Sequence, residues 1–184
     1  RVVDEQSCGQ SRTLRKVCTN PMKQYLQALE TILKDGEIRG DRTGTGTKGI
    51  FGYQTRYDLR NGFPAVTTKK LAWKSVVSEL LWFLEGSTDE RRLVEILHGR
   101  PRSELTDKAT IWTANADAQG VALGYRNDTI VKELGPIYSK QWRDFGGVDQ
   151  ISNLVHDLKE NPLSRRHILN AWNAGEVAHM SLPP

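Results

Sequence analysis

The chain has 184 residues, 38% of them apolar and 26% charged, a composition typical of a soluble globular protein with one sizeable core. Its formal net charge of +4 is too small for a nucleic-acid-binding surface, which normally carries a basic stripe, so we expect no DNA binding. No apolar run approaches the roughly 18 residues that a membrane-spanning helix needs.

Residues 1–21 differ from the rest of the chain. They have no helical or strand periodicity, hold half of the net charge and contain both cysteines, Cys8 and Cys18. Two close cysteines without a C-x-x-C pattern predict neither a disulfide framework nor a metal site, so we expect a cytoplasmic protein. We interpret residues 1–21 as a leader outside a single domain that covers residues 22–184 and starts at Met22. A genuine N-terminal extension is the alternative.

The first predicted helix covers residues 22–35. Asn20 is a suitable N-cap, and Pro21 favours the first helical position. Apolar side chains then recur at intervals of three and four residues, and Gly36 is typical of a helix end.

A strand is predicted next, over residues 49–59, because aromatic and polar residues alternate there; Asn61-Gly62 then predicts a tight turn. A second, strongly apolar helix is predicted over residues 71–85, with Gly86 at its end. We expect its core-facing side chains to be Val76, Val77, Leu80, Leu81 and Leu84.

The second half of the chain is harder to assign. Residues 87–130 are polar and irregular, which predicts a surface excursion with one short helix near Glu90–Leu97. Residues 133–147 are rich in aromatic residues and glycine and predict a loop. A third amphipathic helix is expected within residues 148–161, and a short strand over residues 167–173.

The segment RTGTGTKG, residues 42–49, contains the pattern G-x-G-x-x-G. A dinucleotide-binding loop must follow a strand and open a helix, whereas here a helix precedes the loop and a strand follows it. Arg42 beside glycines and hydroxyl groups could still bind a phosphate through its guanidinium and neighbouring backbone N–H groups. An ordinary turn with a solvated arginine is the alternative.

Three charged residues stand out elsewhere. Glu79 lies alone in the apolar stretch SELLWFLEG, where a carboxylate is costly unless it is hydrogen-bonded or acts as a general acid or base. Its alternative place is the solvent-facing side of the helix. Arg165 and Arg166 lie between a predicted helix and a predicted strand, which suits either a phosphate clamp or a solvated turn.

Aromatic residues offer a possible pocket wall. Trp112, Tyr138 and Trp142 could enclose a flat ring, or they could belong to an ordinary core. The four histidines have no metal-ligand spacing, so we expect no metal site.

Seven segments occur in a fixed order along residues 22–184: DRTGTGT, GFPAVTTKK, SELLWFLEGST, TIW, LGPIYSKQWRDFGG, SRRHILNAWN and MSLPP. Together they resemble the thymidylate synthases, particularly the bacterial and phage-type enzymes. The motifs are long, and the resemblance covers nearly the whole chain after residue 21.

The resemblance implies an α/β (α+β) fold with a twisted sheet and packed helices, in a homodimer whose active sites are shared between subunits. It implies methylation of deoxyuridine monophosphate (dUMP) to thymidine monophosphate (dTMP). The co-substrate 5,10-methylenetetrahydrofolate supplies the carbon and a hydride, and no metal takes part. A cysteine thiolate adds to C6 of the pyrimidine, so that C5 becomes nucleophilic.

The resemblance also assigns roles to charged residues. Arg42 matches the loop arginine that binds the nucleotide phosphate. Arg165 and Arg166 match a pair that reaches across the dimer to the same phosphate. Glu79 matches the glutamate that organises water and proton transfer around the pyrimidine and the folate.

The remaining matched positions concern the ring pockets. Tyr138 matches a tyrosine near the nucleophile and the pyrimidine. Ile111 and Trp112 match the wall of the folate pocket, and Lys69 matches the lysine that meets the glutamate tail of the folate. Two positions depart from the family: Thr113 replaces the usual Asp, and Ser139 replaces the usual Gly.

The nucleophile is the largest departure. In this family a cysteine follows the Leu-Pro-Pro segment directly, and this chain ends at Pro184. Cys8 and Cys18 lie outside the matching region. We therefore expect an N-terminal portion, truncated at the C-terminus, that is inactive alone, whether through an incomplete sequence or a gene interrupted by an intron or intein. Two alternatives remain, a pyrimidine nucleotide hydroxymethylase of the same superfamily and a non-catalytic fragment that binds nucleotide or dimerises.

Overall fold

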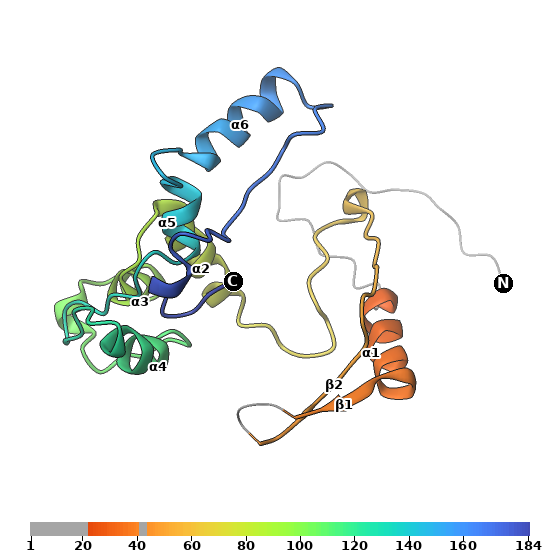
Figure 1. Cartoon of the computed structure of the whole chain (residues 1–184), viewed down its shortest axis with the longest axis horizontal. Coiled ribbons are helices and arrows are strands. Elements are labelled where there is room, and N and C mark those ends of the chain that lie inside the picture. Colours follow the sequence, from red (N-terminus) through yellow and green to blue (C-terminus); the bar gives the residue numbers. More distant parts are fainter. Residues whose placement is uncertain (1–21, 41–43) are drawn as a thin grey trace, which may run out of the picture. The chain divides into compact units, whose positions relative to one another are not determined.

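A computed structural model of the chain describes residues 22–40 and 44–184 (Figure 1). The chain divides into two compact units, Arg1–Leu71 and Ala72–Pro184. Asn20 and Pro21, the expected start of the first helix, and Arg42 lie outside the described residues.

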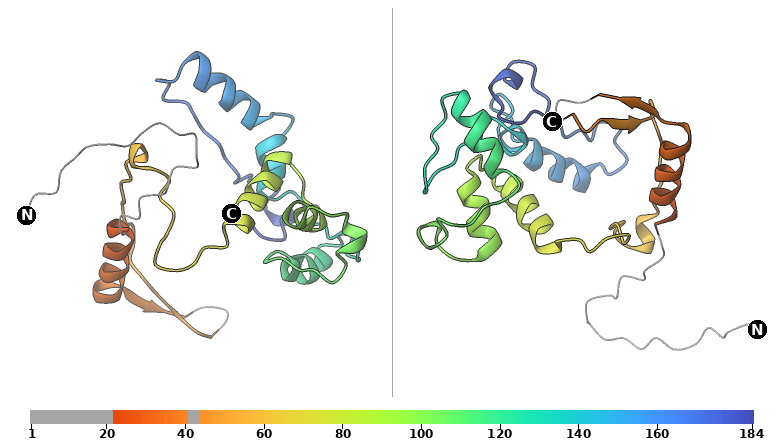
Figure 2. Two further views of the ribbon diagram at one scale, coloured as in Figure 1. Left: turned by 180° about the vertical axis from the view of Figure 1, so that it is seen from behind. Right: turned by 90° about the horizontal axis from the view of Figure 1, so that it is seen from below.

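The first unit contains one helix and one hairpin. The helix α1 spans Lys23–Asp35, as its periodicity predicts, and the strands β1 (Glu37–Arg39) and β2 (Thr47–Gly49) pair antiparallel with Ile38 opposite Lys48. Figures 1 and 2 show that this hairpin starts at the C-terminal end of α1 and projects away from the helix. The glycine-rich segment therefore connects two antiparallel strands, a geometry unlike the strand–loop–helix of a dinucleotide site.

Gly36 joins α1 to β1 in a close approach of backbone to backbone. Its N–H donates to the Ile32 carbonyl at 3.0 Å, and its backbone is extended. A Cβ at this position would lie 2.4 Å from the same oxygen and 3.2 Å from the Gly49 carbonyl. Glycine is required here because there is no room for a side chain.

The strand predicted over residues 49–59 is wrong apart from Gly49, which belongs to β2. Residues 50–58 are irregular and lead into the 3₁₀ turn Leu59–Asn61, and the Phe51 side chain is fully exposed. Alternation predicts which side chains share a face, but a strand also needs a neighbour. No strand among the described residues pairs with this segment.

The second unit is helical. The longer helices α2 and α3 are followed by the three-residue helix α4, which continues as the π-helical turn Ala116–Gly120, and then by α5 and α6. α2 packs against α3 and α5 (Figure 1). α6 continues beyond α5 (Figure 2). None of the α6 side chains is buried. The bounds are α2 Trp73–Glu85, α3 Glu90–His98, α4 Thr113–Asn115, α5 Tyr138–Arg143 and α6 Gln150–Glu160, with 3₁₀ turns at Arg102–Glu104 and Val177–His179.

The core of this unit forms around Trp82, which is fully buried on α2. Its indole N–H donates to the Asp89 carbonyl at 3.1 Å, so the ring is fixed by a hydrogen bond as well as by packing. The buried residues packed with it are Leu93, Trp112, Ala116, Leu134, Ile137 and Met180.

The predicted core face of α2 is wrong. Four of the five side chains expected inside, Val76, Val77, Leu80 and Leu81, are 39–49% exposed, and Leu84 is half-buried. The residues that α2 buries are Ser78 and Trp82. The helix is apolar on most sides, so periodicity alone does not decide which side meets α3 and α5.

The prediction that residues 87–130 form a surface excursion is also wrong. Only its short helix is confirmed, as α3; the same stretch supplies the buried Leu93, Val94, Leu105 and Trp112. The loop predicted over residues 133–147 contains α5, and the strand predicted over residues 167–173 is not formed. The first two errors place buried sequence at the surface because its partners are distant along the chain. The predicted strand has no partner strand among the described residues.

Glu95 on α3 forms a bidentate, partly buried ion pair with Arg102. The guanidinium Nε and Nη2 donate to the two carboxylate oxygens at 3.0 Å each. These hydrogen bonds hold the pKa of Glu95 at about 2, against an ordinary value of 4.5. The side chains are only 18% and 24% exposed, so solvent screens the pair incompletely.

We expect the pair to stabilise the chain above about pH 4.5, and its contribution to disappear as pH falls towards 2, because the folded-state pKa is the lower one. Glu95→Gln should therefore lower the free energy of unfolding by roughly 3 kcal/mol at pH 7 and by much less near pH 2. Urea unfolding across this pH range measures the difference. Glu104→Gln is the control, since Glu104 is 55% exposed and meets Arg100 at 3.7 Å; an equal effect there would contradict the assignment.

Candidate functional site

Glu79 and Trp112 are joined across the second unit. Glu79 is half-buried on α2, and Trp112, 4% exposed, lies on the turn that leads into α4. The indole Nε1–H donates to Glu79 Oε1 at 2.5 Å. The carboxylate and the indole that were singled out in the sequence are therefore direct partners.

Tyr138 adds a hydroxyl group to the same cluster. Its ring, at the start of α5, lies edge-on to Trp112 with centroids 5.7 Å apart, and its hydroxyl donates to the Pro183 carbonyl at 3.2 Å. Burial, and then the negative charge of Glu79, raise the pKa of Tyr138. The hydroxyl thus stays protonated near neutral pH, and the Leu-Pro-Pro segment lies against it.

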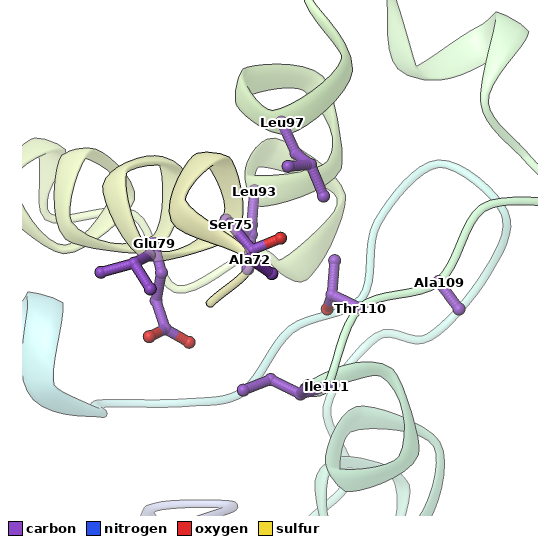
Figure 3. Close-up of a pocket in the computed structure, with 9 residues that line it drawn as sticks. Ala72, Ser75, Glu79, Leu93, Leu97, Ala109, Thr110 and Ile111 are labelled. Atoms are coloured by element: carbon purple, nitrogen blue, oxygen red, sulfur yellow. The ribbon is translucent and has the colours of Figure 1, made fainter. Parts of the chain in front are cut away.

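A hollow of about 440 Å³ opens beside Glu79 (Figure 3). The carboxylate of Glu79 and the side chain of Ile111 are directed into the same space. Its other walls are mostly apolar, a combination that suits a flat ring with one polar edge. The lining residues are Ala72, Ser75, Val76, Glu79, Leu93, Leu97, Ala109, Thr110 and Ile111.

The basic residues singled out in the sequence are placed differently. Arg165 and Arg166 are exposed on the extended segment after α6, and neither guanidinium has an ion pair or hydrogen bond within the described part of the chain. Arg166 lines a separate hollow of about 210 Å³ with Asp157. Lys69 is exposed in the first unit, and Arg42 lies outside the described residues.

Phe83 is a residue of this cluster that the sequence reasoning missed. Its ring meets Trp112, Tyr138 and Trp142 with centroids 5.9, 5.5 and 5.6 Å away. It lies four residues after Glu79, on the same face of α2, so helical spacing was the signal that could have found it. Edge-to-face contacts on three sides fix the rings that border Glu79.

No group of three or more His, Cys, Asp or Glu side chains within residues 22–40 and 44–184 is arranged to hold a metal ion. None of the helices in those two ranges is both long and apolar enough to cross a membrane.

Comparison with known proteins identifies the family. The family model described as thymidylate synthase matches residues 23–184. The chain is 52% identical over 163 residues to a probable thymidylate synthase of Escherichia phage T5, and 50% identical over 163 residues to the thymidylate synthase of Enterobacteria phage T4. Each match covers 89% of this chain, and 56% and 54% of the respective relative. A thymidylate synthase of Mesoplasma florum is 48% identical over 171 residues, with 89% and 59% covered.

The crystal structure of thymidylate synthase from T4 phage matches with a TM-score of 0.78 at 49% identity, covering 88% of this chain and 54% of that one. This likeness confirms the α+β fold class. The chain spans about half the length of the curated relatives it matches. By its match over residues 23–184 and its identity to these relatives, the chain belongs to the thymidylate synthase family.

Proposed function

We propose that the chain is the N-terminal portion of an enzyme that methylates dUMP to dTMP with 5,10-methylenetetrahydrofolate. The observation that carries the proposal is the hydrogen bond between Trp112 and Glu79 beside Tyr138, at the edge of a ring-sized hollow. It combines a carboxylate that can handle protons with an aromatic wall, which methyl transfer to a pyrimidine ring requires.

In this proposal Glu79 moves protons at the pyrimidine and the folate. An indole can only donate, so Trp112 occupies one carboxylate oxygen and leaves the other available to a water molecule or a substrate. The protonated Tyr138 hydroxyl would orient the neighbouring backbone. The nucleophile would be a cysteine that follows Pro184 in the longer protein, and the bond between Tyr138 and Pro183 supports its place in this cluster.

We propose that Arg165 and Arg166 bind the dUMP phosphate, together with Arg42. Their exposure and lack of partners among the described residues leave both guanidinium groups available to a dianion. Lys69 and Ile111 would contact the folate. We further propose a cytoplasmic homodimer in which the arginine pair reaches the site of the other subunit.

The direct test is product analysis after incubation with dUMP and 5,10-methylenetetrahydrofolate. The 184-residue chain is compared with a polypeptide continued through the in-frame sequence that follows Pro184 in its gene. Dihydrofolate and dTMP from the longer polypeptide support the proposal. A hydroxymethylated nucleotide without dihydrofolate would establish the hydroxymethylase alternative, and nucleotide binding without turnover by either polypeptide would establish the non-catalytic one.

Glu79→Gln keeps the shape of the side chain and removes its ability to take up a proton. In the longer polypeptide we expect kcat to fall by about 10²- to 10⁴-fold, with a much smaller change in the KM for dUMP. Glu85→Gln, on the same helix in a solvent-exposed pair with Arg92, is the matched control and should keep normal turnover. Turnover by Glu79→Gln at the wild-type rate would remove Glu79 from the mechanism.

Arg165→Ala and Arg166→Ala test phosphate recognition. Each should weaken dUMP binding by about 10- to 100-fold, the contribution of one hydrogen-bonded charge, and leave the weak binding of deoxyuridine unchanged because that ligand lacks the phosphate. Titration calorimetry with both ligands measures the difference. Arg100→Ala removes an exposed arginine that pairs with Glu104 at 3.7 Å and serves as control. A parallel loss for both ligands would argue against a phosphate contact.

A further inference from the structure

Glu90 and Arg91 form a buried ion pair at the start of α3, and the proposed reaction uses neither. Their side chains are 0% and 1% exposed, with Arg91 Nη1 3.5 Å from Glu90 Oε2. The guanidinium also donates to the Lys108 carbonyl at 2.8 Å and to the Leu105 carbonyl. Buried charges are costly and persist only when further hydrogen bonds satisfy them, which prompts the question of what this pair holds in place.

The other oxygen of Glu90 holds a turn. Glu90 Oε1 accepts hydrogen bonds from the hydroxyls of Thr110 and Thr113, at 2.8 and 2.7 Å. Within the turn, the Thr110 N–H donates to Thr113 Oγ1 at 2.8 Å, and the Trp112 N–H donates to Thr110 Oγ1 at 3.2 Å. The first and last residues of the turn are thus fixed to one buried carboxylate.

The two residues between these anchors form the wall of the candidate site. Ile111 lines the hollow, and Trp112 donates to Glu79. Residues 109–112 belong to no helix or strand, so regular backbone hydrogen bonding does not set the direction of these side chains. The hydroxyl contacts to Glu90 are the polar side-chain bonds that fix both ends of the turn.

We propose that Glu90 is a positioning residue that acts through the Thr113 hydroxyl to hold the Trp112 indole against Glu79. Only the expected effect on catalysis rests on the proposed function. The hydrogen bonds from Thr110 and Thr113 to Glu90 are present without any ligand. The requirement at position 113 is a hydrogen-bond donor facing an anionic carboxylate. Serine satisfies it, valine does not, and aspartate would place a second negative charge against Glu90.

The test compares Thr113→Val with Thr113→Ser in the 184-residue chain, by hydrogen exchange of the indole N–H groups observed by NMR. Thr113→Val should lower the protection of the Trp112 indole by about tenfold or more, since it removes a hydrogen bond to a charged group, and Thr113→Ser should preserve it. Trp112→Phe assigns the resonance. The Trp82 indole, which donates to Asp89, is an internal control for the fold, and Thr106→Val, at an exposed threonine, is the control variant.

Loss of Trp112 protection in Thr113→Val alone supports the proposal. Unchanged protection in Thr113→Val overturns it. If Thr113→Val lowers the protection of both the Trp82 and the Trp112 indole, the Thr113→Ser variant decides. Wild-type protection of the Trp112 indole in Thr113→Ser supports a role for the hydroxyl, and loss of protection in that variant overturns the proposal.

Kinetics of the longer polypeptide separate this inference from the proposed function. Thr113→Val should raise the KM for 5,10-methylenetetrahydrofolate by about tenfold, and Thr113→Ser should leave this KM at the wild-type value. If Thr113→Val lowers the protection of the Trp112 indole but the longer polypeptide forms no dihydrofolate, the positioning role is upheld and the proposed reaction is refuted. If the longer polypeptide is a normal catalyst but Thr113→Val leaves that protection unchanged, the proposed reaction is upheld and the positioning role is refuted.

Discussion

The hydrogen bond between Trp112 and Glu79 is the interaction on which the arrangement of the candidate site depends. It joins α2 to a turn 33 residues further along the chain. A half-buried carboxylate on a largely apolar helix needs a donor, and an indole that is only 4% exposed needs an acceptor. Each group satisfies the other, so the removal of either would leave a polar group poorly paired in a region with little solvent. This mutual requirement fixes the position of the carboxylate before any substrate binds.

The wall of the site is also part of the core. Trp82, Phe83, Trp112 and Tyr138 form a continuous series of ring contacts with centroids 5.2–5.9 Å apart, and most of these contacts are edge-to-face. Rings packed on several sides cannot reorient without disturbing their neighbours. The packing that stabilises the second unit therefore also holds the site rigid. The buried Glu90 extends this support to the turn that carries Trp112.

Sequence alone predicted the elements whose signals are local. α1 and α6 follow from apolar periodicity, and α6 is capped at its N-terminus by Asp149, whose side chain accepts the Ser152 N–H at 2.9 Å. Glu79 stood out because a single carboxylate in an apolar helix is anomalous. The core within residues 87–130 could not be found in this way, because charged residues normally indicate solvent. Two of the donors that satisfy the buried Glu90, the hydroxyls of Thr110 and Thr113, lie 20 and 23 residues away along the chain, and no local pattern reveals such partners.

One of the two failed strand predictions concerns the segment that follows the arginine pair, Arg165 and Arg166, which is proposed to bind the phosphate. Strands are predicted over residues 49–59 and 167–173, but strand pairing is non-local, and apart from Gly49 no residue of either segment pairs with a strand among the described residues. Arg165 and Arg166 precede the second of these segments, and neither guanidinium group has a hydrogen bond or ion pair within the described part of the chain. The carboxylate and the rings are held by packing within the second unit, and the arginine pair belongs to the same unit but lies on an exposed segment of it. Under the proposed function, ring chemistry and phosphate recognition would depend on separate segments of the chain, and substitutions in the two segments would alter different kinetic constants.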